Sequence, residues 1–215
     1  MIDCQLGNVV IIGVGLIGGS LGRALQERNM AARITGVARS RETLDLALQL
    51  GVIDEAEQDP AQAVKDADLV LIATPVSVIG ELLQSIKAHL PEHCIITDAG
   101  SVKGSVVTAA REVLGEGVKK FVPGHPIAGT ENSGVAASFA ELFIDHKVIL
   151  TPLAENADAD VQLVQDMWQA CGANVTCMSV TEHDAILAAT SHLPHLLAFS
   201  LVDFLAQQDS HEVIF

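Results

Sequence analysis

The strongest constraint on the fold is a repeated alternation of short apolar runs and longer amphipathic segments. The first run, "NVVIIG" at 8–13, is rich in β-branched residues, as expected of a strand buried on both faces. Helical patterns follow at about 16–28 and again at 41–50. Six further strand-like runs lie at 33–38, 68–75, 94–100, 119–124, 146–152 and 173–178. Strands separated by helices predict parallel βαβ units in a doubly wound α/β sheet.

The alternation ends after Ser179, and the sequence from Thr181 to about Gln208 is helical in pattern throughout. We therefore predict a first domain at 1–180 and a second, helical one beginning at 181–215, with Thr181 and Asp184 capping its first turn. One apolar helix cannot bury its own face. It must pack on the first domain, on a partner, or on sequence that this chain lacks.

Composition limits the partners and the compartment. The chain has 215 residues, is 49% hydrophobic and carries a formal net charge of −15, which disfavours nucleic acid and anionic membranes. Its N-terminal apolar run, 9–22, is too short and too glycine-rich to span a bilayer. The four cysteines show no metal-type spacing, so we expect reduced thiols in a cytoplasm. The chain has no tyrosine, which excludes dehydrogenases that use a catalytic Tyr–Lys pair.

The turn after the first predicted strand is rich in glycine, with Gly13, Gly15 and Gly18 spaced as GxGxxG. A strand before this motif and a helix after it favour a dinucleotide-binding turn over a glycine-rich loop that binds nothing. Gly13 would make the turn, Gly15 would let the backbone approach a pyrophosphate, and Gly18 would let the helix lie close to the strand. Leu16 and Ile17 would offer the free N–H groups of the helix N-terminus.

The end of the second predicted strand bears on the choice of cofactor. An NAD-selective site usually has Asp or Glu there, but this chain has Arg39, Ser40 and Arg41. Two arginines and a serine can bind a 2′-phosphate, which favours NADP. The alternative is that both arginines are solvated and NAD is used as well.

Polar residues also follow the later predicted strands, at the edge where open α/β sheets bind ligands. Thr74 and Pro75 end the third strand, and Asp98, Ser101 and Lys103 follow the fourth. Ser101 could cap a helix or bond to a substrate hydroxyl, and Asp98 could orient a neighbour or satisfy backbone donors. Lys103 is expected to be solvated or paired.

His125 follows the fifth predicted strand and is the best candidate for an acid or base. Its unperturbed pKa lies near neutrality, and Gly124 and Pro126 predict a stiff turn that would hold the ring in place. His192 and His195, three residues apart, share a helix face, and Pro194 between them should interrupt that helix and free the carbonyl of Thr190. Because no carboxylate accompanies this pair, we predict no metal site.

Together these segments resemble the prephenate dehydrogenase family along essentially the whole chain. The GHPIAG and SHLPH elements are specific to that family, whereas the glycine turn is not. The segments that carry the resemblance are "IIGVGLIGGSLGRAL", "TDAGSVKG", "FVPGHPIAGTENSG", "HKVILTP" and "ATSHLPHLLAFSL".

The resemblance implies a Rossmann-type domain followed by the start of an all-α dimerisation domain, hence a homodimer. It also implies a cytoplasmic enzyme of tyrosine biosynthesis that converts prephenate to 4-hydroxyphenylpyruvate, with hydride transfer to NAD(P) and loss of carbon dioxide. Matched motif by motif, His125 would accept the hydroxyl proton and Ser101 would hold the same hydroxyl. His195 and Thr130 would contact the substrate, and Glu131 would be a gating residue or bind the substrate side chain.

The resemblance also implies that family members continue beyond Phe215 through helices that bring an arginine to the substrate carboxylate. From this sequence alone we expect cofactor binding with poor turnover. Three alternatives stay open. The substrate could be arogenate, or the chain could be a dinucleotide-binding domain without chemistry. A β-hydroxyacid dehydrogenase is disfavoured, because it needs a lysine in the helical region and the last lysine here is Lys147.

Overall fold

The computed structural model describes residues 5–207, and within them the chain forms two sheets. The larger sheet has six parallel strands in the order β3-β2-β1-β4-β5-β6, which is the doubly wound arrangement that the alternating pattern predicts. Its strands are β1 (Asn8–Ile12), β2 (Arg33–Val37), β3 (Glu55–Glu57), β4 (Leu69–Ile72), β5 (Ile95–Asp98) and β6 (Phe121–Val122).

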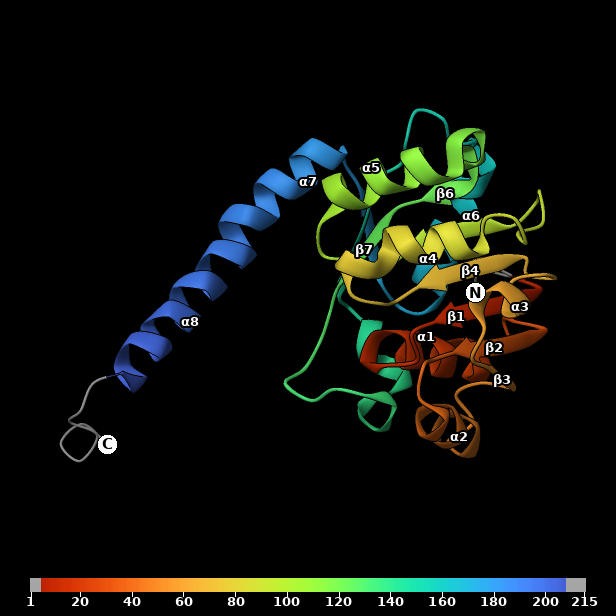
Figure 1. Ribbon diagram of the computed structural model, residues 1–215, viewed down its shortest axis with the longest axis horizontal. Coiled ribbons are helices and arrows are strands. Elements are labelled where there is room, and N and C mark those ends of the chain that lie inside the picture. Colours follow the sequence, from red (N-terminus) through yellow and green to blue (C-terminus); the bar gives the residue numbers. More distant parts are fainter. Residues whose placement is uncertain (1–4, 208–215) are drawn as a thin grey trace.

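Helices cover both faces of this sheet (Figure 1). One layer is formed by α1, α2 and α6, and the other by α3, α4 and α5. The helices are α1 (Leu16–Glu27), α2 (Arg41–Gln49), α3 (Pro60–Ala63), α4 (Ile79–Ile86), α5 (Lys103–Leu114), α6 (Asp158–Ala170), α7 (Val180–Leu187) and α8 (Leu193–Ala206). Shorter helical segments are η1 (Val76–Val78), η2 (Gly115–Lys120), η3 (Val135–Ala137), η4 (Ala140–Phe143) and η5 (Ala188–His192).

The core follows from the side-chain alternation along the central strands. In β1, Val9 and Ile11 pack into the α1, α2 and α6 layer, and Val10 and Ile12 pack into the opposite layer. A strand with both faces covered is apolar at every position, which is why 8–13 reads as a continuous β-branched run. The short β3 has the sequence EAE, so apolar patterning could not have predicted it.

The smaller sheet corrects one expectation. The runs at 146–152 and 173–178 form β8 (Lys147–Leu150) and β9 (Asn174–Cys177), but they do not extend the parallel sheet. They form a separate sheet with β7 (Gly124–Ile127), which pairs antiparallel to β8. Pro123 separates β6 from β7 and has no N–H to donate to a ladder, so the chain changes sheets there.

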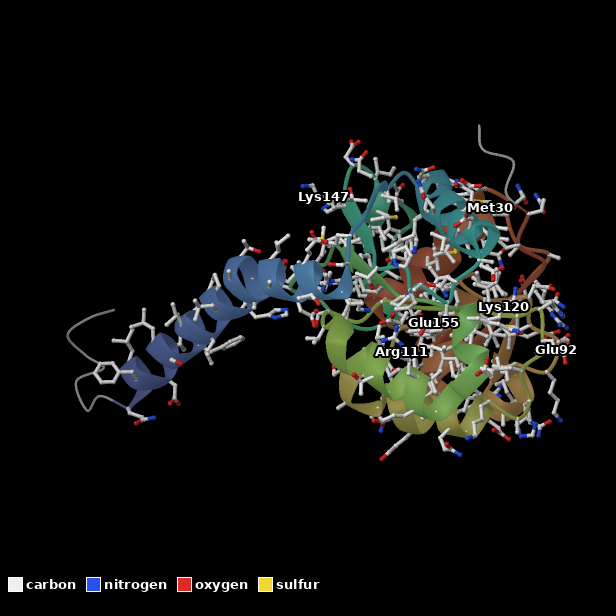
Figure 2. The ribbon with its side chains drawn as sticks, turned by 90° about the horizontal axis from the view of Figure 1, so that it is seen from above. Met30, Glu92, Arg111, Lys120, Lys147 and Glu155 are labelled. Carbon is white, nitrogen blue, oxygen red and sulfur yellow. The ribbon has the colours of Figure 1, made fainter. Side chains whose placement is uncertain are left out.

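The C-terminal helix projects away from the α/β body (Figure 1). α7, η5 and α8 form one helix from Val180 to Ala206, 27 residues long. Its most apolar window has a mean hydropathy of 1.5, so by length and composition it could span a bilayer. Side chains of α8 point into solvent all around it (Figure 2), and Phe199 is 73% exposed.

Two expectations about this helix are wrong in detail. The capping box is formed by Ser179 and Glu182, not by Thr181 and Asp184, because the carboxylate of Asp184 binds elsewhere. Pro194 does not break the helix. The five-residue π-turn η5 precedes it, and the N–H of Leu193 bonds to the carbonyl of Ala188, so the helix continues past the proline.

Candidate functional site

The glycine turn between β1 and α1 has the geometry of a phosphate-binding turn. Gly13 has φ +103°, and a Cβ there would lie 2.5 Å from the carbonyl oxygen of Ala73. A Cβ on Gly18 would lie 2.2 Å from the carbonyl oxygen of Gly13, so neither position accepts a side chain. A Cβ on Gly15 would have no neighbour within 4 Å. Gly15 therefore faces open space in front of the α1 N-terminus.

A dinucleotide fits this turn on two further observations. No side chain caps α1, so the backbone N–H groups of Leu16 and Ile17 are available to a pyrophosphate. At the adjacent end of β4, the hydroxyl of Thr74 is buried and has no hydrogen-bond partner within the described residues. A buried hydroxyl of this kind suits a ligand that supplies the missing bond. Pro75, next to it, is exposed and opens η1.

The two arginines that follow β2 differ in their side-chain contacts. Ser40 caps α2 by accepting from the N–H of Thr43, and Arg41 pairs with Asp45 at 2.9 Å. Arg39 is exposed, and its guanidinium has no partner among residues 5–207. Arg39 is thus the one of the two whose charge is free for a ligand.

A buried ion pair connects β5 to the strand that carries His125. Lys103 and Asp98 are fully buried and bond to each other, and Lys103 Nζ also donates to the carbonyl of Gly124 at 2.6 Å. Asp98 accepts from the N–H groups of Gly100 and Gly124 as well, so it both orients a neighbour and satisfies backbone donors. Lys103 is paired, and the expectation that it could be solvated is wrong. Burial lowers the pKa of Lys103, against the opposing effect of Asp98.

His125 lies in a strand and not in a turn. β7 places it opposite Ile149 of β8, so the sheet ladder, more than Gly124 and Pro126, holds its backbone. The bonds of Gly124 to Asp98 and Lys103 bring this strand to the carboxyl edge of β5. In the doubly wound sheet that is the edge where the glycine turn also lies. His125 as a whole residue keeps 9% of its surface exposed.

A second imidazole touches the first. The ring nitrogen Nδ1 of His125 lies 2.9 Å from Nε2 of His183, and the two rings meet edge to face. The other nitrogen of His183 lies 2.8 Å from Oδ1 of Asp184. Three ionisable side chains, Asp184, His183 and His125, therefore form one hydrogen-bonded row.

Burial makes His125 a neutral imidazole at neutral pH. Its pKa is lowered to about 3, first by desolvation and then by the electrostatic effects of Lys103, His183 and His192, while Asp184 opposes the shift. A neutral ring has one nitrogen without a proton, and such a nitrogen can accept a proton from a bound alcohol.

Ser101 does not cap α5. The N-cap residue is Val102, and the N–H groups of Lys103 and Gly104 bond instead to the carboxylate of Asp184, at 2.8 and 2.7 Å. Ser101 is exposed, and its hydroxyl has no partner within the described part of the chain. The capping alternative is wrong, and the hydroxyl is available to a ligand.

The other predicted substrate residues are exposed. Thr130 and Glu131 are exposed in the loop after β7, where the Thr130 hydroxyl bonds to the backbone of Asn132. His195 is exposed on α8. His192 is half-buried in η5 and close enough to His125 to lower its pKa.

Sequence reasoning missed His183 and gave Asp184 the wrong role. His183 is fully buried and lies 58 residues from its partner in the sequence. It could have been suspected from a single signal, the polar triplet "EHD" at 182–184 in the first turn of an otherwise apolar helix. Periodicity alone assigns such residues to a solvated helix start.

Comparison with known proteins identifies the family. Residues 21–177 match the family described as "Prephenate dehydrogenase, nucleotide-binding domain", and residues 179–214 match "Prephenate dehydrogenase, dimerization domain". The chain is 40% identical to a cyclohexadienyl dehydrogenase of Zymomonas mobilis, over 91% of this chain and 66% of that protein. It is 39% identical to a prephenate dehydrogenase of Bacillus subtilis, over 90% of this chain and 52% of that protein.

A solved structure agrees in fold. The prephenate dehydrogenase of Aquifex aeolicus, in complex with hydroxyphenyl propionate and NAD+, superposes with a TM-score of 0.91 at 38% identity, covering 98% of this chain and 73% of that one. The chain spans between about half and two thirds of the length of the two relatives above. With a doubly wound sheet, a dinucleotide-type turn and matches along nearly its whole length, this chain belongs to the prephenate dehydrogenase family.

Proposed function

We propose that this chain carries the dehydrogenase site of an enzyme that converts prephenate to 4-hydroxyphenylpyruvate with NAD(P). The observation that carries the proposal is His125, a neutral imidazole at the carboxyl edge of the sheet. The exposed hydroxyl of Ser101, which has no partner among residues 5–207, follows β5 at the same edge. Family membership supports it, as do the NAD+ and hydroxyphenyl propionate bound by the similar Aquifex aeolicus enzyme.

The residues would divide the chemistry as follows. Gly15 and the α1 N-terminus would bind the cofactor pyrophosphate, with Thr74 and Pro75 beside it. A bound nicotinamide would supply the hydride acceptor. Ser101 would hold the ring hydroxyl of the substrate while His125 accepts its proton. His125 would return that proton to the phenolic oxygen once carbon dioxide has left and the ring is aromatic, so no net proton is consumed.

The experiment is a reduced-nicotinamide absorbance assay on the full-length protein, with prephenate and arogenate each combined with NAD and NADP. We expect reduction of the cofactor with prephenate. Turnover only with arogenate would move the assignment to the arogenate dehydrogenases, and no turnover with either substrate would contradict it.

We further propose that NADP is preferred, with Arg39 contacting the 2′-phosphate. The support is that Arg39 has no partner among the described residues, whereas Arg41 is engaged by Asp45. Arg39→Asp should raise KM for NADP far more than KM for NAD, and Arg41→Asp serves as the matched control. Equal effects of Arg39→Asp on both cofactors would remove the phosphate role.

The assembly and the remaining contacts are proposals of the same kind. We propose a homodimer formed through the exposed α8, which the dimerisation-domain match supports.

The division into 1–180 and 181–215 is retained as a proposal, with residues 208–215 outside the described part of the chain. Thr130, Glu131 and His195 are retained as substrate contacts. A cytoplasmic location is supported by the free thiols of Cys94 and Cys177.

A further inference from the structure

We propose that His183 and Asp184 are positioning residues that hold His125 with its proton on Nδ1 and a bare nitrogen at Nε2. The inference rests on the proposed role of His125 as proton acceptor. It adds the reason why one nitrogen of that ring, and not the other, is the acceptor.

The starting point is Asp184, whose carboxylate can only accept hydrogen bonds when ionised. Its two oxygens accept from the N–H groups of Lys103 and Gly104, in the first turn of α5. Both donors belong to a helix N-terminus, where a negative charge is stabilised. These donors favour an ionised carboxylate, and the nitrogen of His183 that faces it must be a donor.

The position of the proton on His183 then determines which nitrogen of His125 is protonated. His183 is fully buried, and in the proposed row it carries a single proton. With Nδ1–H donating to Asp184 at 2.8 Å, the neutral ring has no proton on Nε2. That nitrogen lies 2.9 Å from Nδ1 of His125, so it accepts and His125 Nδ1–H donates. The proton on His125 is thereby placed on Nδ1, and Nε2 is left as the acceptor.

The same carboxylate connects the base to the residue proposed to hold the substrate. Ser101 lies two residues before Lys103, just ahead of the first turn of α5, which Asp184 binds. Asp184 itself lies in α7, next to His183. One side chain thus fixes the segment that carries Ser101 and, through His183, the ring of His125. A displacement of α7 relative to α5 would change both at once.

The direct test is NMR of the imidazole nitrogens in the full-length, uniformly 15N-labelled protein near pH 7, because two-bond correlations report which nitrogen carries the proton. We expect the Nδ1–H form for both His125 and His183. A wild-type His125 with its proton on Nε2 would overturn the proposal. So would a His183 protonated on both nitrogens, because it would then donate to His125.

Two substitutions extend the test. In His183→Gln the side-chain oxygen can still accept from His125, whereas in His183→Phe nothing can. We expect His183→Gln to keep the Nδ1–H form and most of kcat. We expect His183→Phe to show both tautomers and to lower kcat about 100-fold, within the range of general base catalysis, with cofactor affinity unchanged. His93→Phe makes the same change at an exposed histidine paired with Asp68. It should change neither the tautomer of His125 nor kcat.

The outcomes separate this inference from the proposed function. Wild-type kcat in both His183 variants, with loss of activity in His125→Asn, would overturn the positioning role and leave His125 as the base. Wild-type kcat in His125→Asn would instead overturn the proposed function. If His183→Phe does not fold, the wild-type spectrum and His183→Gln still decide the question.

Discussion

The buried pair of Lys103 and Asp98 bonds to Gly124, the residue before His125. Its contribution to stability can be measured. Removing the ammonium of Lys103 would leave Asp98 as a fully buried carboxylate with only two backbone donors. We expect Lys103→Met to lower the free energy of unfolding by about 3 kcal/mol, as when one partner of a buried pair is removed. Urea denaturation of the wild type and the variant measures this change in the free energy of unfolding.

The surface pair of Arg111 and Glu155 is the matched control. Arg111 donates to Glu155 at 3.0 and 3.1 Å, and both side chains are exposed, by 51% and 38%. Arg111→Met should change the free energy of unfolding far less than Lys103→Met does. Equal effects of the two substitutions would contradict the assignment of Lys103 to a buried pair.

His125 itself should make stability depend on pH. Its pKa is about 3 in the folded chain against 6.5 for an unperturbed imidazole, so the unfolded state binds more protons between these values. Stability is therefore full above pH 6.5 and is lost as the pH falls. The charged and titratable neighbours of the ring are Lys103, His183, His192 and Asp184.

His125→Asn isolates this contribution. Between pH 7 and pH 5 the wild type should lose about 2 kcal/mol more unfolding free energy than the variant does. Denaturant titrations at the two pH values give the difference. The same loss in both proteins would show that the ring is not neutral in the folded state.

At the scale of elements, the β1–α1 turn allows binding to be separated from packing. A side chain at Gly15 meets nothing within 4 Å in the protein, whereas one at Gly18 meets backbone. We expect Gly15→Ala to keep the wild-type Tm and to weaken dinucleotide binding at least about tenfold, equivalent to about 1.4 kcal/mol. Gly18→Ala should lower Tm instead. Calorimetry gives both values, and unchanged affinity in Gly15→Ala would contradict the phosphate role of the turn.

The elements also show what patterning can predict. The doubly wound sheet and helices α1 and α2 follow from apolar periodicity, because buried strands and amphipathic helices differ in period. Apolar periodicity does not predict the separate β7-β8-β9 sheet, because strands of either sheet have the same two-residue side-chain period. Only the break at Pro123 distinguishes the two sheets. The charged β3 and the π-turn before Pro194 carry no apolar signal.

The site was predictable only in part, for a related reason. Gly13, Gly15, Gly18 and His125 sit in local motifs that a sequence displays directly. His125 and His183 lie 58 residues apart in the sequence, and their contact depends on how α7 packs on α5. Contacts of that kind follow from tertiary packing and leave no local pattern.

At the scale of the whole molecule, the exposed α8 requires a cover. A helix with Phe199, Val202 and other large apolar side chains in water favours association, and we propose a second copy of the chain. Phe199→Glu with Val202→Glu should convert a dimer to a monomer in sedimentation velocity experiments. Ser85→Glu, which adds a similar charge on the distant α4, should not. A monomeric wild type, or a wild type that partitions into lipid vesicles, would contradict the dimer.

The central claim is that the imidazole of His125 takes the substrate proton, and steady-state kinetics of His125→Asn in the full-length protein test it most directly. The account predicts that kcat falls by about 10²- to 10⁴-fold, the contribution of a general base, while the Kd for the dinucleotide stays at the wild-type value. Wild-type kcat in that variant would contradict the account.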